Sequence, residues 1–162
     1  MRKGFTLIEL IVVIFMAGLL TTISAVSVFQ VQQKRQTKAV AKQVKNVIME
    51  AHAYAVSPKT DITDSAQVDI IVTDHTIGAR IGNTDIVGPV KVSRKVTLTC
   101  LQPVEATGLC FYFKRGNESG TFNALGQTFD DLPHDIRAKS STDERYTITT
   151  SPKSGNVTIT TP

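Results

Sequence analysis

The stretch Gly4-Phe5-Thr6-Leu7-Ile8-Glu9-Leu10 (GFTLIEL) places a carboxylate directly before a long uncharged run. Residues 10–33 contain no Asp, Glu, Lys or Arg. As a helix, this run would be about 36 Å long, enough to cross the hydrocarbon core of a bilayer. A charged side chain at bilayer depth costs roughly 2.5–3.5 kcal/mol even on lenient scales. Glu9 is therefore expected to have a partner of opposite charge, or to reach water at the end of the span.

Basic residues flank the uncharged run. Arg2 and Lys3 precede it, and five follow it closely: Lys34, Arg35, Lys38, Lys42 and Lys45. From Lys59 onward basic and acidic residues nearly balance, so the net charge of +4 comes from these flanks. This distribution favours contact with anionic lipid headgroups over a nucleic-acid-binding domain, with a solvated helix face as the plainer alternative.

The run differs from an ordinary secretory signal, whose apolar core is shorter and ends at a cleavage site. Ser24-Ala25-Val26-Ser27 could serve as such a site, but the helical pattern continues past it without a turn signal. The basic residues after the run would keep the rest of the chain in the cytoplasm, whereas a cysteine pair favours export. Composition alone leaves the orientation open.

The segment Arg2-Lys3-Gly4-Phe5-Thr6-Leu7-Ile8-Glu9-Leu10, with the apolar run behind it, resembles the class III signal of type IV pilins and type II secretion pseudopilins. In that family, prepilin peptidase removes a short basic leader on the cytoplasmic side, and the new N-terminal residue is N-methylated. The resemblance implies that Gly4 ends the leader and that Phe5 becomes the methylated N-terminus. It also implies a C-terminal domain outside the cytoplasmic membrane, which resolves the orientation.

The resemblance also gives Glu9 a role in assembly. Cleavage after Gly4 would create a positive amino group on Phe5. Residues i and i+4 share a helix face, so Glu9 could pair with this amine in its own chain. The resemblance implies that Glu9 instead meets the amine of a neighbouring subunit and sets the register of a helical bundle. The spacing by itself only permits that contact.

The apolar helix differs from that of many major pilins because it contains no Pro. Val26 stands where they have one, and Gly18 is the only intrinsic weak point, worth about 1 kcal/mol relative to Ala. The missing Pro favours a minor pilin or a pseudopilin. Residues 122–127 (FNALGQ) resemble a Phe-Asn-x-x-Gly turn of minor pilins and H-like pseudopilins, although an ordinary turn between strands is compatible with them.

A second apolar pattern extends the helix. Its residues recur at helical spacing: Val40, Val44, Val47, Ile48, Ala51 and Ala55. Ser57-Pro58 ends the pattern, so we expect one helix from Phe5 to about Ser57. The expected organisation is a leader at 1–4, a transmembrane or filament-core helix at 5–33, its amphipathic continuation at 34–57 and a globular β-domain at 58–162.

The rest of the chain has strand character. Runs rich in β-branched and aromatic residues predict strands at 68–73, 90–92, 95–99, 109–114, 136–138, 146–150 and 156–160. The turns expected between them include Gly88-Pro89, Gly116-Asn117, Ser119-Gly120 and Leu132-Pro133. The predicted fold is α+β, with a long N-terminal helix packed on an antiparallel β-sheet as in pilins.

The two cysteines lie near strand ends. Cys100 is expected to end one strand and Cys110 to begin the next, and their spacing does not fit a Cys-x-x-Cys redox or zinc motif. In an exported domain, a disulfide between them would stabilise the fold by about 2–3 kcal/mol. In a reducing compartment they would be two buried thiols.

The sequence offers little support for catalysis, a metal or a cofactor. The three histidines are far apart and lack metal-ligand spacing: His52, expected at the helix surface or core edge, His75, and His134, expected in a loop. There is no phosphate loop or nucleophile elbow. The cluster of Asp130, Asp131 and Asp135 lacks calcium-loop spacing. Two small basic clusters do not make the domain net basic, so DNA is an unlikely partner: Lys91, Arg94 and Lys95, and Lys114 with Arg115.

The sequence therefore predicts a non-enzymatic structural subunit of a type IV pilus or pilus-like filament. The resemblance implies, as partners, other pilin subunits, prepilin peptidase, the cytoplasmic (inner) membrane and an inner-membrane assembly platform. An H-like type II secretion pseudopilin is the alternative within this class. A single-pass anchored binding domain that never polymerises is the alternative of another class, and a membrane-tethered enzyme lacks a candidate constellation.

Overall fold

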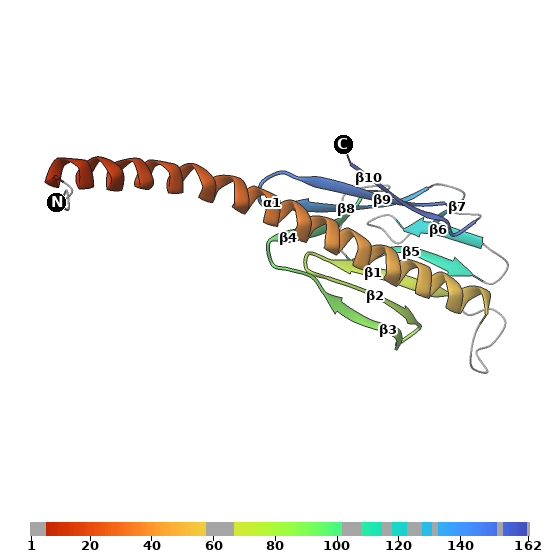
Figure 1. Cartoon of the computed structure of the whole chain (residues 1–162). Helices are drawn as coiled ribbons and strands as arrows, with labels where there is room; N and C mark the ends of the chain where they lie inside the picture. The colour runs from red at the N-terminus through yellow and green to blue at the C-terminus, as the bar shows by residue number, and fades with distance from the viewer. Residues whose placement is uncertain are drawn as a thin grey trace.

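The computed structural model describes residues 6–57, 67–101, 108–114, 118–122, 128–130, 133–151 and 154–161, with the backbone alone at 21–27, 118, 120–122 and 128–130. A 50-residue helix, α1 (Leu7–Val56), leads the fold. Its N-terminal half projects away from the strands, and its C-terminal half lies across them (Figure 1). The N–H of Ser57 donates to Ala53 O at 2.9 Å, and Pro58 follows in the sequence, so the helix ends where it was predicted to end.

The C-terminal half of α1 is buried along the predicted apolar stripe. Each member of the stripe is at most 5% exposed: Val40, Val44, Val47, Ile48, Ala51 and Ala55. Lys38 and Lys42, which lie off the stripe, are exposed, and Lys45 is partly exposed. Because the stripe contacts strands of both sheets described below, it forms the centre of the core.

The strands form two antiparallel sheets beneath the helix (Figure 1). The first has the order β3-β2-β1-β5-β6-β7, built from β1 (Val68–Thr73), β2 (Thr76–Ile81), β3 (Thr84–Lys91), β5 (Gly108–Lys114), β6 (Glu118–Phe122) and β7 (Thr128–Asp130). The second has the order β10-β9-β8-β4, built from β4 (Val96–Cys100), β8 (His134–Ser140), β9 (Arg145–Thr150) and β10 (Val157–Thr160). The predicted α+β fold is confirmed, with two sheets where one was expected.

Several local predictions were wrong. Gly88 and Pro89 lie inside β3, because β3 is an edge strand and its pairing with β2 shifts register between Ile77 and Ala79. A Pro is tolerated in an edge strand or at a bulge, where its missing N–H breaks no ladder hydrogen bond. Ser119-Gly120, expected as a turn, lies within β6. Strands β2, β6 and β7 were not predicted.

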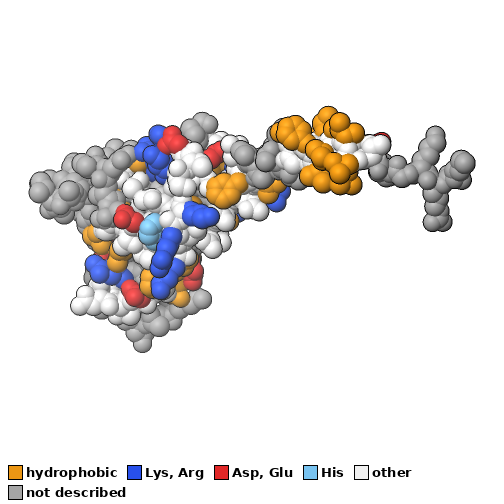
Figure 2. All heavy atoms as spheres, turned by 90° about the vertical axis from the view of Figure 1, so that its left-hand side faces the viewer, with side chains coloured by type: hydrophobic (Ala, Val, Ile, Leu, Met, Phe, Trp, Pro, Cys, Tyr) orange, Lys and Arg blue, Asp and Glu red, His pale blue; other side chains and the backbone are white. Residues whose placement is uncertain are grey.

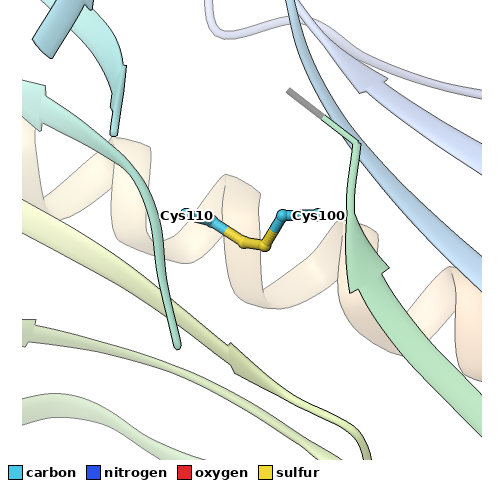
Figure 3. Close-up of a disulfide and its surroundings, with 2 residues drawn as sticks. All are labelled: Cys100 and Cys110. Carbon is cyan, nitrogen blue, oxygen red and sulfur yellow. A yellow bond between two sulfur atoms is a disulfide. The ribbon is translucent and has the colours of Figure 1, made fainter. Parts of the chain in front are cut away.

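A disulfide joins the two sheets. Cys100 ends β4 of the second sheet, and Cys110 lies in β5 of the first, with their Cα atoms 5.9 Å apart (Figure 3). Both side chains are at most 5% exposed. Because β4 and β5 do not pair with each other, this bond is a covalent link across the core between elements that hydrogen bonds leave separate.

Removing this link is expected to destabilise the protein without changing its fold. The double variant Cys100→Ser, Cys110→Ser should lose about 2–3 kcal/mol of unfolding free energy, because the unfolded chain regains the conformational freedom that the closed loop had removed. Urea unfolding of the full-length chain in detergent micelles measures the change. Reduced wild-type protein is the control and should match the variant. Equal stability of oxidised wild type and variant would contradict the prediction.

The turn between β9 and β10 fits closely against the helix. Gly155 has φ +61°, and a Cβ at this position would overlap the ring of His52 on α1. Gly82 has a similar φ of +58°, but nothing lies within 4 Å of the place that its Cβ would take, which makes it a matched control.

Gly155→Ala should therefore cost more stability than Gly82→Ala. Both replacements carry the penalty of a left-handed backbone, about 1–2 kcal/mol, and the first adds overpacking of about 1–3 kcal/mol. The measurement is the difference between their urea midpoints. Equal losses would show that the contact with His52 relaxes without cost.

Candidate functional site

A cap on Thr6 positions Glu9 in the first turn of α1. Thr6 has extended backbone angles, and its Oγ1 accepts the N–H of Glu9 at 3.4 Å. The same hydroxyl lies 3.5 Å from Glu9 Oε2 and donates to it. This is a variant of the capping box, in which a Thr cap and a Glu three residues later satisfy each other. The Thr-x-x-Glu spacing is visible in the sequence, yet the cap was not predicted.

The cap determines where the Glu9 carboxylate lies. It stays in the first helical turn, where the positive end of the helix dipole favours a negative charge. Glu9 is exposed, so its second oxygen and most of its lone pairs remain accessible. Gly4 and Phe5, the predicted cleavage and methylation positions, lie outside the described residues. The geometry thus presents an acidic group at the helix tip, beside the position where the mature N-terminus is predicted.

The N-terminal half of α1 exposes a large apolar surface. Every large apolar side chain described between Leu7 and Val31 is from 50% to 77% exposed. Figure 2 shows these hydrophobic side chains gathered on the projecting part of the helix. Soluble monomers rarely expose contiguous apolar patches above a few hundred Å², so this surface calls for a partner. Within the part of the chain that the structure describes, no helix is both long enough and apolar enough to cross a membrane.

The helix enters the β-domain at Gln33. Gln33 is 7% exposed, and it is the first buried side chain among the described residues of α1; Thr37 follows one turn later, fully buried. Thr37 Oγ1 donates to Gln33 O at 3.0 Å, which gives the buried hydroxyl a partner. The exposed apolar surface and the buried stripe therefore belong to two separate halves of one helix.

Comparison with known proteins bears on this N-terminal half. Residues 1–25 match the family model described as the prokaryotic N-terminal methylation motif. The motif marks the type IV pilin and pseudopilin family. The pilin-like arrangement of a long helix on antiparallel sheets agrees with it. No curated protein and no solved structure matches the chain.

The N-terminal methylation motif is associated with a defined route of processing and assembly. Proteins with this motif are processed by prepilin peptidase, anchored in the inner membrane before assembly, and polymerise. Members of the pilin family are structural and non-enzymatic. The chain thus carries the N-terminal methylation motif of type IV pilins and pseudopilins, on a helix and sheets arranged as in pilins.

A buried histidine, His134, lies in the β-domain, away from the N-terminal half of α1. The sequence predicted a loop at this position. His134 begins β8 and is 1% exposed. Its ring stacks on Phe111 of β5, with centroids 4.7 Å apart and an interplanar angle of 16°. Its Nε2 lies 3.0 Å from Ser119 Oγ of β6, and its buried Nδ1 has no hydrogen-bond partner among the described residues. Burial lowers the pKa of His134 from its ordinary value of 6.5 to about 4.

A second histidine lies on the other side of the same aromatic pair. His52 of α1 meets Phe113 edge-on at 5.1 Å, and Phe113 meets Phe111 edge-on at 5.5 Å. His52 is half-buried, as expected for the core edge, and burial lowers its pKa. The row His52–Phe113–Phe111–His134 therefore links α1, β5 and β8 through ring contacts. Its signal in the sequence is weak, because the four residues come from three distant segments.

The structure describes only part of the predicted acidic cluster, of the predicted Phe-Asn-x-x-Gly turn and of the predicted basic clusters. Asp131 and Arg115 lie outside the described residues, as does 123–127 of the predicted Phe-Asn-x-x-Gly turn, and Asp130 is described by its backbone only. Among the described residues, no three His, Cys, Asp or Glu side chains are grouped so as to hold a metal ion. The basic cluster is exposed: Lys91 ends β3, and Arg94 and Lys95 lie between β3 and β4.

Proposed function

We propose that this chain is a subunit of a type IV pilus or pilus-like filament, assembled through α1. The main support for this proposal is the N-terminal methylation motif at residues 1–25, followed by a helix whose first half exposes its apolar side chains. Prepilin peptidase cuts after Gly4, and Phe5 becomes the N-methylated N-terminus. The exposed half of α1 lies in the inner membrane before assembly, and afterwards packs against the same helix of other subunits.

The proposed subunit has four parts. Residues 1–4 form the leader, 5–33 the membrane or filament-core helix, 34–57 its amphipathic continuation and 58–162 the β-domain that faces outward. The burial pattern supports the boundary in the helix, because Gln33 is the first buried side chain among the described residues of α1. In the filament, Glu9 of one subunit pairs with the Phe5 amine of its neighbour. An accessible carboxylate at the helix tip supports this contact.

A type II secretion pseudopilin of the H-like kind is the second candidate. Two observations favour a minor pilin or such a pseudopilin over a major pilin: α1 runs without Pro or interruption from Leu7 to Val56, and residues 122–127 resemble a turn of both kinds of subunit. The two candidates share their processing and the use of Glu9. They differ in the inner-membrane assembly platform that takes up the subunit.

Processing by prepilin peptidase tests the proposal. The chain expressed with the peptidase should lose the mass of residues 1–4 and gain one methyl group, and without it should keep the leader. Gly4→Leu should block cleavage, because the residue before the cut is altered. Gly18→Ala is the matched control: it replaces a glycine with open space around it, and cleavage should proceed. An intact leader on the wild-type chain in the presence of active peptidase would contradict the proposal.

A further inference from the structure

One end of the β-domain surrounds the point where α1 leaves it. The ammonium of Lys95, which follows β3, lies 5.4 Å from the ring centroid of Phe29 on α1. The N–H of Ser141, in the turn after β8, donates to Lys95 O at 3.2 Å. Lys34 of α1 lies 3.9 Å from Glu144 of the same turn. We call this end the basal face, defined by Lys34, Arg35, Arg94, Lys95 and the turn 141–144.

The basal face looks along the projecting helix. Figure 2 views the molecule from that side and shows Lys and Arg side chains over the β-domain, interspersed with Asp and Glu side chains, with the apolar part of α1 projecting to one side. Arg94 and Lys95 are both exposed. In the sequence they follow Lys34 and Arg35 by some 60 residues. The fold therefore brings them next to the helix.

The acidic groups of the basal face already have cationic partners. Asp143 pairs with Lys139 at 3.0 Å and with Arg145 at 2.8 Å, and Glu144 pairs with Lys34. Among the described residues, neither Arg35 nor Arg94 lies within ion-pair distance of a carboxylate. Asp74 in the adjoining β1–β2 turn is the one further acidic residue of the described loops at this end. With Asp74 counted against Arg35, Arg94 and Lys95, the described part of this face still keeps a net positive charge.

The length of the helix determines where the basal face lies relative to the bilayer. From Leu10 to Phe29 the helix rises about 30 Å, which is the thickness of the hydrocarbon core of a bilayer. With Glu9 at one membrane surface, Phe29 lies at the other, where aromatic rings are favoured. Lys95, above the Phe29 ring, and Lys34, just over one helical turn further on, then lie among the headgroups. Guanidinium groups bind phosphate oxygens with two parallel hydrogen bonds, so arginine suits this layer.

We propose that the basal face binds the phosphate groups of anionic phospholipids in the outer leaflet of the inner membrane, and so seats the β-domain on the membrane before assembly. The inference rests on the proposed function only in requiring that α1 spans the membrane. Release of these headgroups is then part of extracting each subunit into a filament.

Hydrogen–deuterium exchange of the full-length chain in lipid nanodiscs tests the proposal. The peptide covering residues 92–96 should exchange on the order of tenfold more slowly in discs containing phosphatidylglycerol than in discs of phosphatidylcholine alone. High salt should remove the difference, because the contact is electrostatic. Inorganic phosphate added to phosphatidylcholine discs should not reproduce it, and full protection by soluble phosphate would overturn the assignment to lipid.

Two variants make the test specific. Arg94→Gln with Lys95→Gln should abolish the dependence on phosphatidylglycerol. Lys114→Gln is the matched control, since Lys114 makes a similar contact over the Tyr112 ring, 5.1 Å from its centroid, at the opposite end of the sheet. Equal exchange in both lipids, or lipid dependence retained by the double variant, would overturn the proposal. Protease protection of α1 in the discs separates this result from a failure of the helix to insert, which would count against the proposed function.

Discussion

Glu9→Leu is expected to reduce incorporation into filaments by at least about tenfold, while leaving the subunit processed and held in the membrane. The carboxylate is the only charge in the described helix before Lys34, and the Thr6 cap fixes it at the tip. Removing one partner of an ion pair shielded from water costs several kcal/mol, because the other charge is left unpaired. Each 1.4 kcal/mol corresponds to a factor of about ten. Immunoblots of sheared filaments against membranes measure the ratio.

Two further variants show which property of Glu9 matters. Glu9→Gln keeps the shape and hydrogen-bonding capacity but removes the charge, so it should also fail if pairing with an amine sets the register. Glu50→Leu is the control, because it replaces an exposed acidic residue in the half of α1 that lies on the β-domain. Normal incorporation of Glu9→Leu would indicate that the subunits do not pair through this carboxylate, and would favour an anchored domain that does not polymerise.

Lowering the pH from 7 to 4 is expected to remove about 3 kcal/mol of stability through His134 alone. Its pKa is about 4 in the folded protein and near 6.5 in the unfolded chain. Between pH 6.5 and pH 4, His134 is protonated in the unfolded chain but stays neutral in the folded protein, so the free energy of unfolding falls. The loss is complete near pH 4, and above pH 6.5 the group contributes no slope. Urea unfolding of the full-length protein in micelles, repeated across this range, measures it.

His134→Gln separates this residue from the other titrating groups. The variant is less stable at pH 7, because it loses the stack on Phe111, but its stability should fall much less between pH 6.5 and pH 4. The slope that remains belongs to other groups, including His52, whose pKa is also lowered by burial. An unchanged slope in the variant would contradict the assignment of the acid sensitivity to His134.

The helix and its burial could be predicted from the sequence because their signals are local. The uncharged run, the apolar stripe ending at Ala55 and the Ser57-Pro58 stop all lie within one continuous segment. The disulfide was also within reach, since two cysteines leave a single intramolecular pairing. The capping pair Thr6 and Glu9 was equally local, because its Thr-x-x-Glu spacing is itself a helix-start signal.

The division into two sheets could not be predicted, because it depends on long-range pairing. β1 pairs with β5, and β4 pairs with β8, so neither pair is a simple hairpin between neighbours in the chain. The position of His134 has the same cause. Leu132-Pro133 indicates a turn, but Phe111 and Ser119, which bury the ring, come from strands 15 or more residues away. Periodicity detects which face of a strand is apolar and not which strand lies against it.

The central claim is that the chain is cut after Gly4 and enters a filament through the new N-terminus. Mass spectrometry of filaments sheared from the native cell surface tests it most directly. We predict an N-terminal peptide that begins at N-methylated Phe5, abundant if the subunit is the main component and scarce if it is a minor one. A protein that retains Met1 to Gly4 in cells with active prepilin peptidase, and is absent from every filament preparation, would contradict the account.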